Sequence, residues 1–365
     1  MTTEVSKLPN HPVWVFSAVS ANLPLNAFLA LGIRDYNPSH SMRTVRLNSN
    51  YVGKLRQSLL SWYDGNRRDL PWRKTRDPYR IWVSEIMLQQ TRVGAVLPKY
   101  ERFLRRFASV QQLAAAREST VLTEWSGLGY YRRARNLHAA AKLVSRAGKF
   151  PQSSEAWRTL PGIGRYTAAA IASIGFNEAV AVLDGNVERV LRRLFNRTCS
   201  GEPAWKAAAA LLDPLRPGDF NQAMMELGAT VCLPGEPNCA GCPISIFCRT
   251  RGPGRAVRSK PRQQKRELTY MLIQHNDSVL LVKRPPGASL MPGMWELPSL
   301  TKSRKSDEPK FSLRHSITVT DFEVHVVRRR ATASSPGPWI KVSRLNSIPL
   351  TGLARKILRK ARIIL

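Results

Sequence analysis

The segment Leu160–Asn186, LPGIGRYTAAAIASIGFNEAVAVLDGN, decides the fold. It begins with a Pro-Gly-Ile-Gly hairpin, continues through an expected helix rich in small residues (Tyr166–Ile174), and places Asp184 just before another helix. Because glycine adopts positive φ without steric cost, Gly162 and Gly164 allow backbone amides to point outward at the start of the first helix and hold a phosphate. An ordinary helix connection with glycine capping is the alternative.

The position of Asp184 in the sequence is compatible with two roles at once. It follows an apolar run and precedes Gly185, Asn186 and the expected helix Val187–Phe195, so it is a favoured N-cap residue. A carboxylate at the amino end of a helix stays ionised, because backbone amides and the helix dipole stabilise the anion. We therefore expect an exposed, ionised carboxylate that also caps the helix.

A second carboxylate, Glu85, lies on an apolar helix. It comes four residues after Ile81 and three after Trp82, so it shares a helix side with large apolar groups. Burial raises the pKa of a carboxyl group and keeps it protonated, as a general acid requires. A boundary Glu paired with a nearby arginine is the alternative. A protonated Glu85 with an ionised Asp184 matches the pair of carboxyl groups that breaks glycosidic bonds, in which one protonates the leaving group and the other stabilises an oxocarbenium-like centre.

Polar and aromatic residues adjoin basic ones at two further places. Gln90 and its neighbours follow the helix of Glu85 where a solvent face would more often carry Lys or Glu. Tyr130 and Tyr131 precede a basic helix, and aromatic rings beside arginines suit base stacking with cations on phosphates. A tyrosine in the core is the alternative for either ring. Four arginines near Trp72 indicate phosphate contacts or a solvated face, namely Arg68, Arg73, Arg76 and Arg80.

The composition indicates a polyanionic partner. The 365 residues contain 57 Lys and Arg against 25 Asp and Glu, a formal net charge of +32. Such an excess favours nucleic acid first and a ribosome-like or membrane surface second. No apolar run approaches the length of a membrane helix, and the first residues do not resemble a signal peptide. We expect a cytoplasmic monomer, associated with the nucleoid if bacterial, that binds no membrane.

Four of the five cysteines form a C-x6-C-x2-C-x5-C array. Crowded thiols in so long a chain indicate metal ligation in a reducing compartment, not disulfides. A structural zinc is the ordinary alternative to an iron–sulfur centre, but zinc modules usually place two short C-x2-C pairs far apart. The predicted metal ligands are Cys232, Cys239, Cys242 and Cys248.

Composition and periodicity divide the chain into four segments. Residues 1–41 lack the arginine density that follows, so we expect a disordered extension or an upstream misassigned start. Residues 42–248 show helical periodicity, and the basic segment 249–266 reads as a linker able to lie along phosphates. Residues 267–365 alternate as strands, with a hairpin at 275–278 and a final basic helix, which predicts a separate α+β domain.

Six motifs in register resemble adenine DNA glycosylases of the MutY type, within the helix-hairpin-helix glycosylase superfamily. They are SEIMLQQTRV, GLGYYRRARNLHAAA, LPGIGRYTAAAI, LDGNVERVLRR, MELGATVC and the cysteine array. The resemblance implies a mainly α fold: a two-lobed helical domain with a DNA groove and a 4Fe-4S cluster loop, then a smaller α+β Nudix-like domain. It also implies hydrolytic removal of adenine mispaired with 8-oxoguanine or guanine in double-stranded DNA.

The resemblance assigns roles by position. Glu85 matches the acid that protonates adenine, and Asp184 matches the carboxylate that stabilises the sugar cation. The target base must leave the duplex, because its glycosidic bond is not reachable inside a stack. Further matches are the active-site helpers Tyr166 and Asn186, the adenine-pocket contacts Arg73 and Glu226 near Trp72, the duplex wedges Gln90 and Tyr130, and the hairpin residues Gly162 and Gly164.

Two departures refine the resemblance. In endonuclease III-like glycosylase/lyases the hairpin ends in a lysine that forms a Schiff base with the sugar, whereas here Tyr166 predicts a monofunctional enzyme. The Nudix-like segment VLLVKRPPGASLMPGMWELP lacks the Glu-rich metal-binding helix, so we expect this domain to recognise DNA and not to hydrolyse a pyrophosphate, with Thr318 or His315 as the sensor of oxidised guanine.

Two alternatives to this function are an endonuclease III-like enzyme acting on oxidised pyrimidines and a non-catalytic iron–sulfur DNA-binding or redox-sensing protein.

Overall fold

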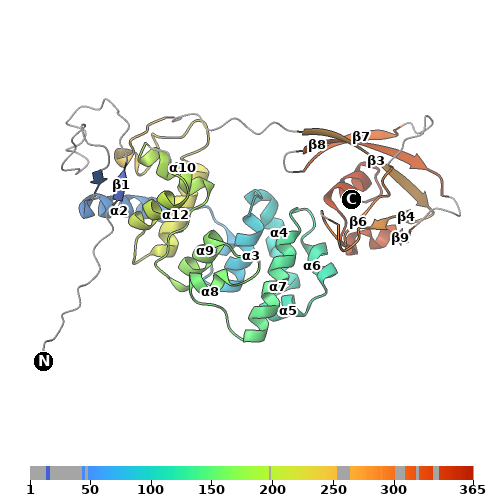
Figure 1. The fold of residues 1–365 in the computed structure, drawn as a ribbon, viewed down its shortest axis with the longest axis horizontal. Helices are drawn as coiled ribbons and strands as arrows, with labels where there is room; N and C mark the ends of the chain where they lie inside the picture. Colours follow the sequence, from blue (N-terminus) through green and yellow to red (C-terminus); the bar gives the residue numbers. More distant parts are fainter. Residues whose placement is uncertain are drawn as a thin grey trace. The chain divides into compact units, whose positions relative to one another are not determined.

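The computed structural model describes residues 14–16, 43–45, 48–196, 199–252, 264–288, 290–300, 309–317, 320–331 and 337–364 (Figure 1). Contacts divide the chain into two compact units. The first comprises Met1–Pro78, Gln152–Arg158 and Gly164–Ala256, and the second comprises Tyr79–Pro151, Thr159–Ile163 and Val257–Leu365. The carboxy-terminal segment therefore groups with the helices that follow Pro78.

The first unit is helical, with a short antiparallel strand pair. Its strands are β1 (Trp14–Phe16) and β2 (Arg43–Val45). Its helices are α2 (Ser49–Asn66), η1 (Pro71–Arg73), α8 (Ser154–Arg158), α9 (Arg165–Phe176), α10 (Gly185–Leu194), α11 (Glu202–Leu211), α12 (Pro217–Thr230) and η2 (Ser245–Phe247). The predicted helices that flank Asp184 are confirmed.

Helical periodicity explains the core of this unit. Val52, Leu55 and Leu59 recur at three- and four-residue steps and bury one face of α2, whose start is capped by Asn48. The helix α9 instead buries a run of alanines, 168–170 and 172, and it packs against α8 and α12. Small side chains let these helices approach closely, which sets the position of the segment that leads to Asp184.

The second unit combines helices with a mixed sheet. Its helices are α3 (Pro78–Leu88), α4 (Val93–Arg106), α5 (Val110–Ala115), α6 (Glu118–Glu124), α7 (Arg132–Ala147), η3 (Val342–Ser347) and α13 (Gly352–Lys360). Its strands are β3 (Gln264–His275), β4 (Ser278–Leu280), β5 (Val282–Lys283), β6 (Trp295–Glu296), β7 (Phe311–Ile317), β8 (Thr320–Arg329) and β9 (Trp339–Lys341).

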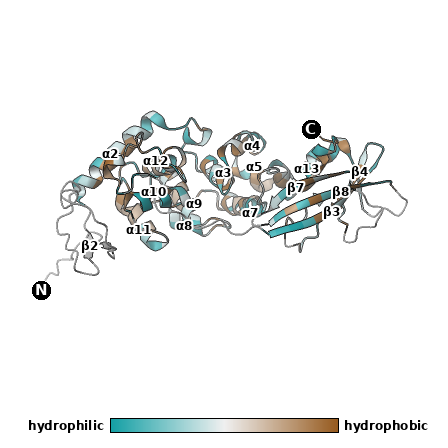
Figure 2. Ribbon diagram, turned by 90° about the horizontal axis from the view of Figure 1, so that it is seen from above, coloured by the Kyte–Doolittle hydropathy of each residue, from teal (hydrophilic) through white to brown (hydrophobic). Residues whose placement is uncertain are grey.

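Among the described strands, β7-β8-β3-β4-β9 form one sheet in that order. β3 and β8 pair in parallel, and the other neighbours in the sheet are antiparallel. Leu353 and Ile357 of α13 pack into the same core as Val324 and Val326 of β8. In Figure 2 the strands and α13 carry apolar and hydrophilic residues side by side, as half-buried elements do. The mainly α fold with a smaller α+β part is confirmed.

The structure also corrects the predicted boundaries. The hairpin at 275–278 is confirmed, with Asn276 at φ 49° in the turn. The strand β3 begins at Gln264, so the last three residues of the predicted linker belong to the sheet, while 253–263 lie outside the described residues. Apart from β1, the predicted extension 1–41 also lies outside them. None of the described helices is long and apolar enough to span a membrane.

Candidate active site

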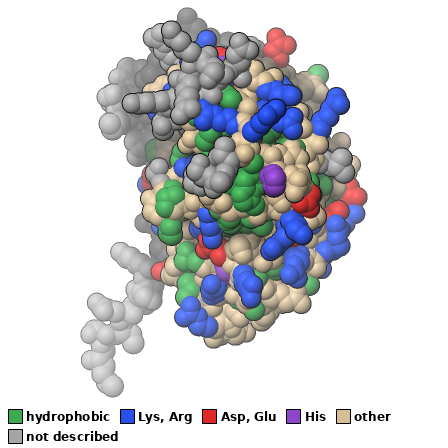
Figure 3. Space-filling model, turned by 90° about the vertical axis from the view of Figure 1, so that its right-hand side faces the viewer, with side chains coloured by type: hydrophobic (Ala, Val, Ile, Leu, Met, Phe, Trp, Pro, Cys, Tyr) green, Lys and Arg blue, Asp and Glu red, His purple; other side chains and the backbone are tan. Residues whose placement is uncertain are grey.

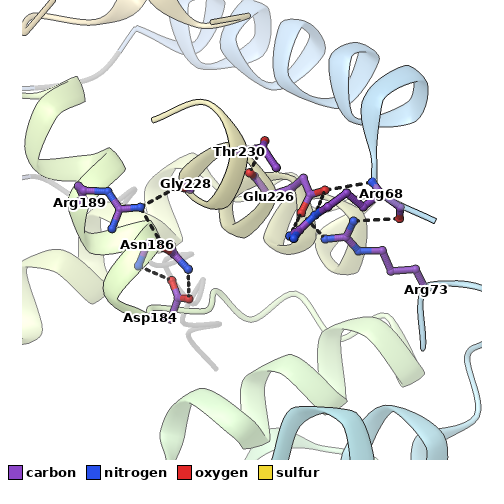
Figure 4. A network of polar contacts seen from close by, with 8 residues as sticks. All are labelled: Arg68, Arg73, Asp184, Asn186, Arg189, Glu226, Gly228 and Thr230. Atoms are coloured by element: carbon purple, nitrogen blue, oxygen red, sulfur yellow. Dashed lines mark hydrogen bonds and ion pairs between the residues drawn. The ribbon is translucent and has the colours of Figure 1, made fainter. Parts of the chain in front are cut away.

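Asp184 is the N-cap of α10, as the sequence predicts. Its Oδ1 accepts hydrogen bonds from the backbone amides of Asn186 (2.9 Å) and Val187 (2.7 Å), and its Oδ2 accepts one from Asn186 Nδ2 (3.0 Å) (Figure 4). These three donors fix the orientation of the carboxylate. The side chain is half-buried, not exposed as expected, because the preceding segment packs inward at Val182.

Arg189 in turn fixes the side chain of Asn186 by a hydrogen bond. The guanidinium of Arg189 donates to Asn186 Oδ1 (2.9 Å), to the carbonyl of Gly228 (2.6 Å) and to the carbonyl of Cys232 (2.8 Å). A Cβ atom on Gly228 would lie 2.6 Å from Cβ of Asn186, so only glycine permits this approach of α12 to α10. The loop of Asp184 is thus tied to the end of α12 and to the cysteine loop.

Glu226 of α12 is completely buried and forms an ion pair with two arginines. Arg68 donates through Nε (2.8 Å) and Nη2 (2.6 Å), and Arg73 donates through Nη2 (2.7 Å). Burial opposes the charged carboxylate, but the hydrogen bonds from both arginines outweigh it and lower the pKa of Glu226 to about 2. The structure therefore brings together Arg73 and Glu226, the two residues that the resemblance matches to adenine-pocket contacts (Figure 4).

The remaining predicted residues of the first unit lie on α9 and η1. Tyr166 is in the first turn of α9, with its hydroxyl 3.3 Å from Sδ of Met225, and Trp72 is buried in η1. Gly164 caps α9 with extended backbone at φ −88°. Positive φ is confirmed at Gly162, with 77°, and is wrong for Gly164.

Glu85, Gln90 and Tyr130 belong to the second unit. Glu85 is 5% exposed within α3, which confirms the predicted burial. Gln90 is exposed and Tyr130 is 46% exposed, and both residues adopt positive φ, 54° and 46°. Thr318 lies outside the described residues, so its sensing role stays a prediction.

The four cysteines of the predicted metal loop line one pocket together with Arg193. Arg193 Nη1 donates to Sγ of Cys232 (3.3 Å), and the amide of Gly252 donates to Sγ of Cys239 (3.4 Å). Burial and the neighbouring thiols raise the pKa of Cys242 to about 11. Within the described residues no group of three or more His, Cys, Asp or Glu is already spaced to hold a metal ion. Four soft sulfur donors facing one pocket, with N–H groups directed at two of them, nevertheless fit an iron–sulfur centre.

Sequence reasoning missed several inward-facing arginines. Arg68 is expected from the sequence to contact phosphate or to face solvent, but its guanidinium bonds the carboxylate of Glu226. Arg189 and Arg193 lie four residues apart on α10, and both bond the Cys232 region. Their helical spacing could have placed both on one face. No local pattern, however, marks that face as turned toward the cysteine loop.

Residues 83–216 match the model of the family described as HhH-GPD superfamily base excision DNA repair protein. The adenine DNA glycosylase of Arabidopsis thaliana is 39% identical, covering 78% of this chain and 53% of the relative. The adenine DNA glycosylase of Homo sapiens is 38% identical, covering 68% of this chain and 58% of the relative. The chain thus spans little more than half the length of these two relatives.

A solved thermostable thymine-DNA glycosylase is similar in fold, with a TM-score of 0.51 and 30% identity. The likeness covers 54% of this chain and 95% of that structure. The adenine DNA glycosylase of Buchnera aphidicola subsp. Baizongia pistaciae is 36% identical, covering 62% of this chain and 69% of the relative. On this coverage and identity, with the superfamily match across the hairpin and Asp184, the chain belongs to the adenine DNA glycosylase family.

Proposed function

We propose that this protein is a monofunctional adenine DNA glycosylase acting on adenine opposite 8-oxoguanine or guanine in double-stranded DNA. The observation that carries the proposal is the carboxylate of Asp184, which three hydrogen-bond donors orient at the start of α10. An anion held in place in advance is what a developing sugar cation requires, because the site need not reorganise when charge appears. The identity of the excised base, adenine, is inferred from membership of the adenine DNA glycosylase family.

In the proposed mechanism the two carboxylates divide the work. Glu85, buried in an apolar helix, protonates the adenine ring so that it can leave, and Asp184 stabilises the cationic sugar until water adds. Asn186 holds Asp184, and Glu226 with Arg73 provides fixed charges for the adenine pocket near Trp72. The wedges Gln90 and Tyr130 help the base leave the stack.

The monofunctional assignment rests on Tyr166. A lyase needs an amine to attack the sugar carbon, and the first turn of α9 offers a phenol at this position. Borohydride treatment during turnover should therefore trap no covalent protein–DNA adduct. Efficient trapping, in a sample free of other glycosylases, would contradict the assignment.

We further propose that Cys232, Cys239, Cys242 and Cys248 hold a 4Fe-4S cluster. The cluster would cross-link the loop after α12, and Arg193 would donate hydrogen bonds to its Cys232 sulfur and to the loop carbonyls of Leu233 and Gly235. Purified protein should contain about four irons and four sulfides per chain. Stoichiometric zinc in a colourless sample would replace the cluster assignment.

The proposed partner is duplex DNA carrying an adenine mispair, bound by a monomer. Figure 3 shows Lys and Arg side chains spread across one face of the molecule, which suits a polyanion. The decisive comparison uses three duplexes, with adenine opposite 8-oxoguanine, adenine opposite guanine, and an oxidised pyrimidine. Release of adenine from the first two supports the proposal. Release of the oxidised pyrimidine alone would favour the endonuclease III-like alternative.

A further inference from the structure

The guanidinium of Arg133, at the start of α7, points into the protein. It donates to the carbonyls of Ile86 (2.9 Å), Met87 (3.0 Å) and Gln89, and to Oγ1 of Thr91 (3.1 Å). The last carbonyls of a helix have no partner within that helix. Arg133 therefore caps the carboxyl end of α3 and holds the turn that follows it.

The same guanidinium also holds a second turn. It donates to the carbonyls of Leu128 (3.0 Å) and Gly129 (3.3 Å). It also lies over the rings of Trp125 and Tyr130, at 5.5 and 5.4 Å from their centroids. One half-buried side chain thus joins two turns, each of which carries an exposed residue in an unusual conformation.

Those two residues are Gln90 and Tyr130, with φ of 54° and 46°. The left-handed region is costly for residues other than glycine, and it persists only where surrounding contacts determine it. The bonds of Arg133 supply such contacts, because they fall on Gln89 and Thr91 on either side of Gln90 and on Gly129 before Tyr130. The side chains held in this way are turned to solvent, where they are available to a ligand.

We propose that Arg133 is a positioning residue that sets Gln90 and Tyr130 together in the conformation that separates a base pair. The assignment rests on the proposed glycosylase function and adds to it the residue that couples the two wedges. An arginine suits the task because its planar fork presents five donors in fixed directions and its face stacks on aromatic rings. A lysine at this position keeps the charge but cannot make the fork.

The test compares Arg133→Lys with a matched variant on the same helix. Arg146→Gln removes a cation from the exposed far end of α7, where Arg146 Nε donates to the carbonyl of Lys142. We expect Arg133→Lys to slow single-turnover adenine excision at least about tenfold, and Arg146→Gln to change it less than about twofold. Rates are compared below the unfolding temperature of each variant.

A general structural defect is distinguished by a mutant cycle. If Arg133 acts through the wedges, Arg133→Lys should slow excision by no more than about twofold in a Gln90→Ala/Tyr130→Ala background. A full tenfold loss in that background overturns the proposal. Thr91→Val removes the hydroxyl that accepts from Arg133 and donates to the carbonyl of Gln89, and it leaves Arg133 itself intact. It provides a milder variant if Arg133→Lys does not fold, and it should slow excision about threefold in the wild-type background only.

Hydrogen exchange tests the role of Arg133 without relying on glycosylase activity. In Arg133→Lys, amides of residues 89–91 and 128–131 should exchange at least about fivefold faster, while the rest of α7 is unchanged. A wild-type protein that releases no adenine contradicts the glycosylase proposal, whereas unchanged exchange at both turns contradicts the role of Arg133. If the wild-type protein releases adenine but the losses of rate from Arg133→Lys and from Gln90→Ala/Tyr130→Ala are independent, only the role of Arg133 is contradicted.

Discussion

At the scale of single residues, the buried charge of Glu226 shows how this protein uses its excess of arginine. A completely buried carboxylate is costly unless it is paired and hydrogen-bonded. Arg68 and Arg73 supply that pairing across 158 and 153 residues of sequence. Part of the positive charge is therefore structural, because it neutralises a buried carboxylate.

The pKa of Glu226 gives a pH-dependent prediction. Its pKa falls from the ordinary 4.5 to about 2, so its contribution to stability is complete above pH 4.5 and is lost as the pH falls toward 2. Glu226→Gln should lower the free energy of unfolding at pH 7 by about 3 kcal/mol, and the difference from wild type should shrink below pH 4. Urea unfolding at pH 7 and pH 3 measures both.

Glu202→Gln is the matched control for Glu226→Gln. Glu202 pairs with Arg165 at 2.6 Å, but both side chains are largely exposed. Exposed ion pairs contribute little to stability, so this variant should unfold much like wild type at either pH. Equal losses for the two variants would show that burial of the Glu226 pair is not what stabilises it.

Two glycines of the hairpin give a second prediction at this scale. A Cβ atom on Gly162 would lie 2.5 Å from Cβ of Asn136, and its φ of 77° is unfavourable for alanine, whereas Gly164 has extended backbone and open space. Gly162→Ala should lower the free energy of unfolding by about 1–3 kcal/mol, and Gly164→Ala should leave it within about 0.5 kcal/mol. Thermal unfolding compares them, and a larger loss for Gly164→Ala would contradict the hairpin geometry.

At the scale of elements, helix ends organise the proposed chemistry. Asp184 is the N-cap of α10, Arg133 caps the carboxyl end of α3, and Gly164 is the N-cap of α9. Helix ends present backbone groups that the helix itself does not pair, so they bind charged side chains and anions strongly. The proposed site residues are thus fixed by hydrogen bonds at helix ends, some local in sequence, as at Asp184, and some between distant segments, as at Arg133.

The capping and catalytic roles of Asp184 can be separated by experiment. Asparagine caps a helix about as well as aspartate, so Asp184→Asn should leave stability within about 0.5 kcal/mol, while Asp184→Ala should lower it by about 1 kcal/mol. Both variants should slow adenine excision at least about a hundredfold, because both remove the anion. An Asn variant that excises at the wild-type rate would leave Asp184 with a structural role alone.

The sequence predicts elements better than it predicts the partners of charged residues. Helical periodicity predicted the helical part of the chain, and the sequence around Asp184 predicted the N-cap and the helix that follows it, because these features are local. The direction of Arg68 and Arg133 was not predictable, since an arginine in a basic run faces solvent or a buried acceptor according to distant segments. Motif resemblance located Glu226, but only the structure shows that two arginines bind its carboxylate.

At the scale of the whole molecule, the two proposed catalytic carboxylates belong to different compact units. Glu85 belongs to the second unit and Asp184 to the first, so the acid and the stabilising anion come from separate bodies of the chain. The hairpin that carries Gly162 and Gly164 is divided between the same units. The assignment of Glu85 as the general acid is the central claim to test.

Single-turnover release of adenine from a duplex with adenine opposite 8-oxoguanine tests that claim most directly. Wild-type protein should release adenine and leave the strand uncut, whereas Glu85→Gln should release it at least about a thousandfold more slowly while binding the same duplex with nearly unchanged affinity. Excision by Glu85→Gln at the wild-type rate would contradict the account, and so would a wild-type protein that releases no adenine.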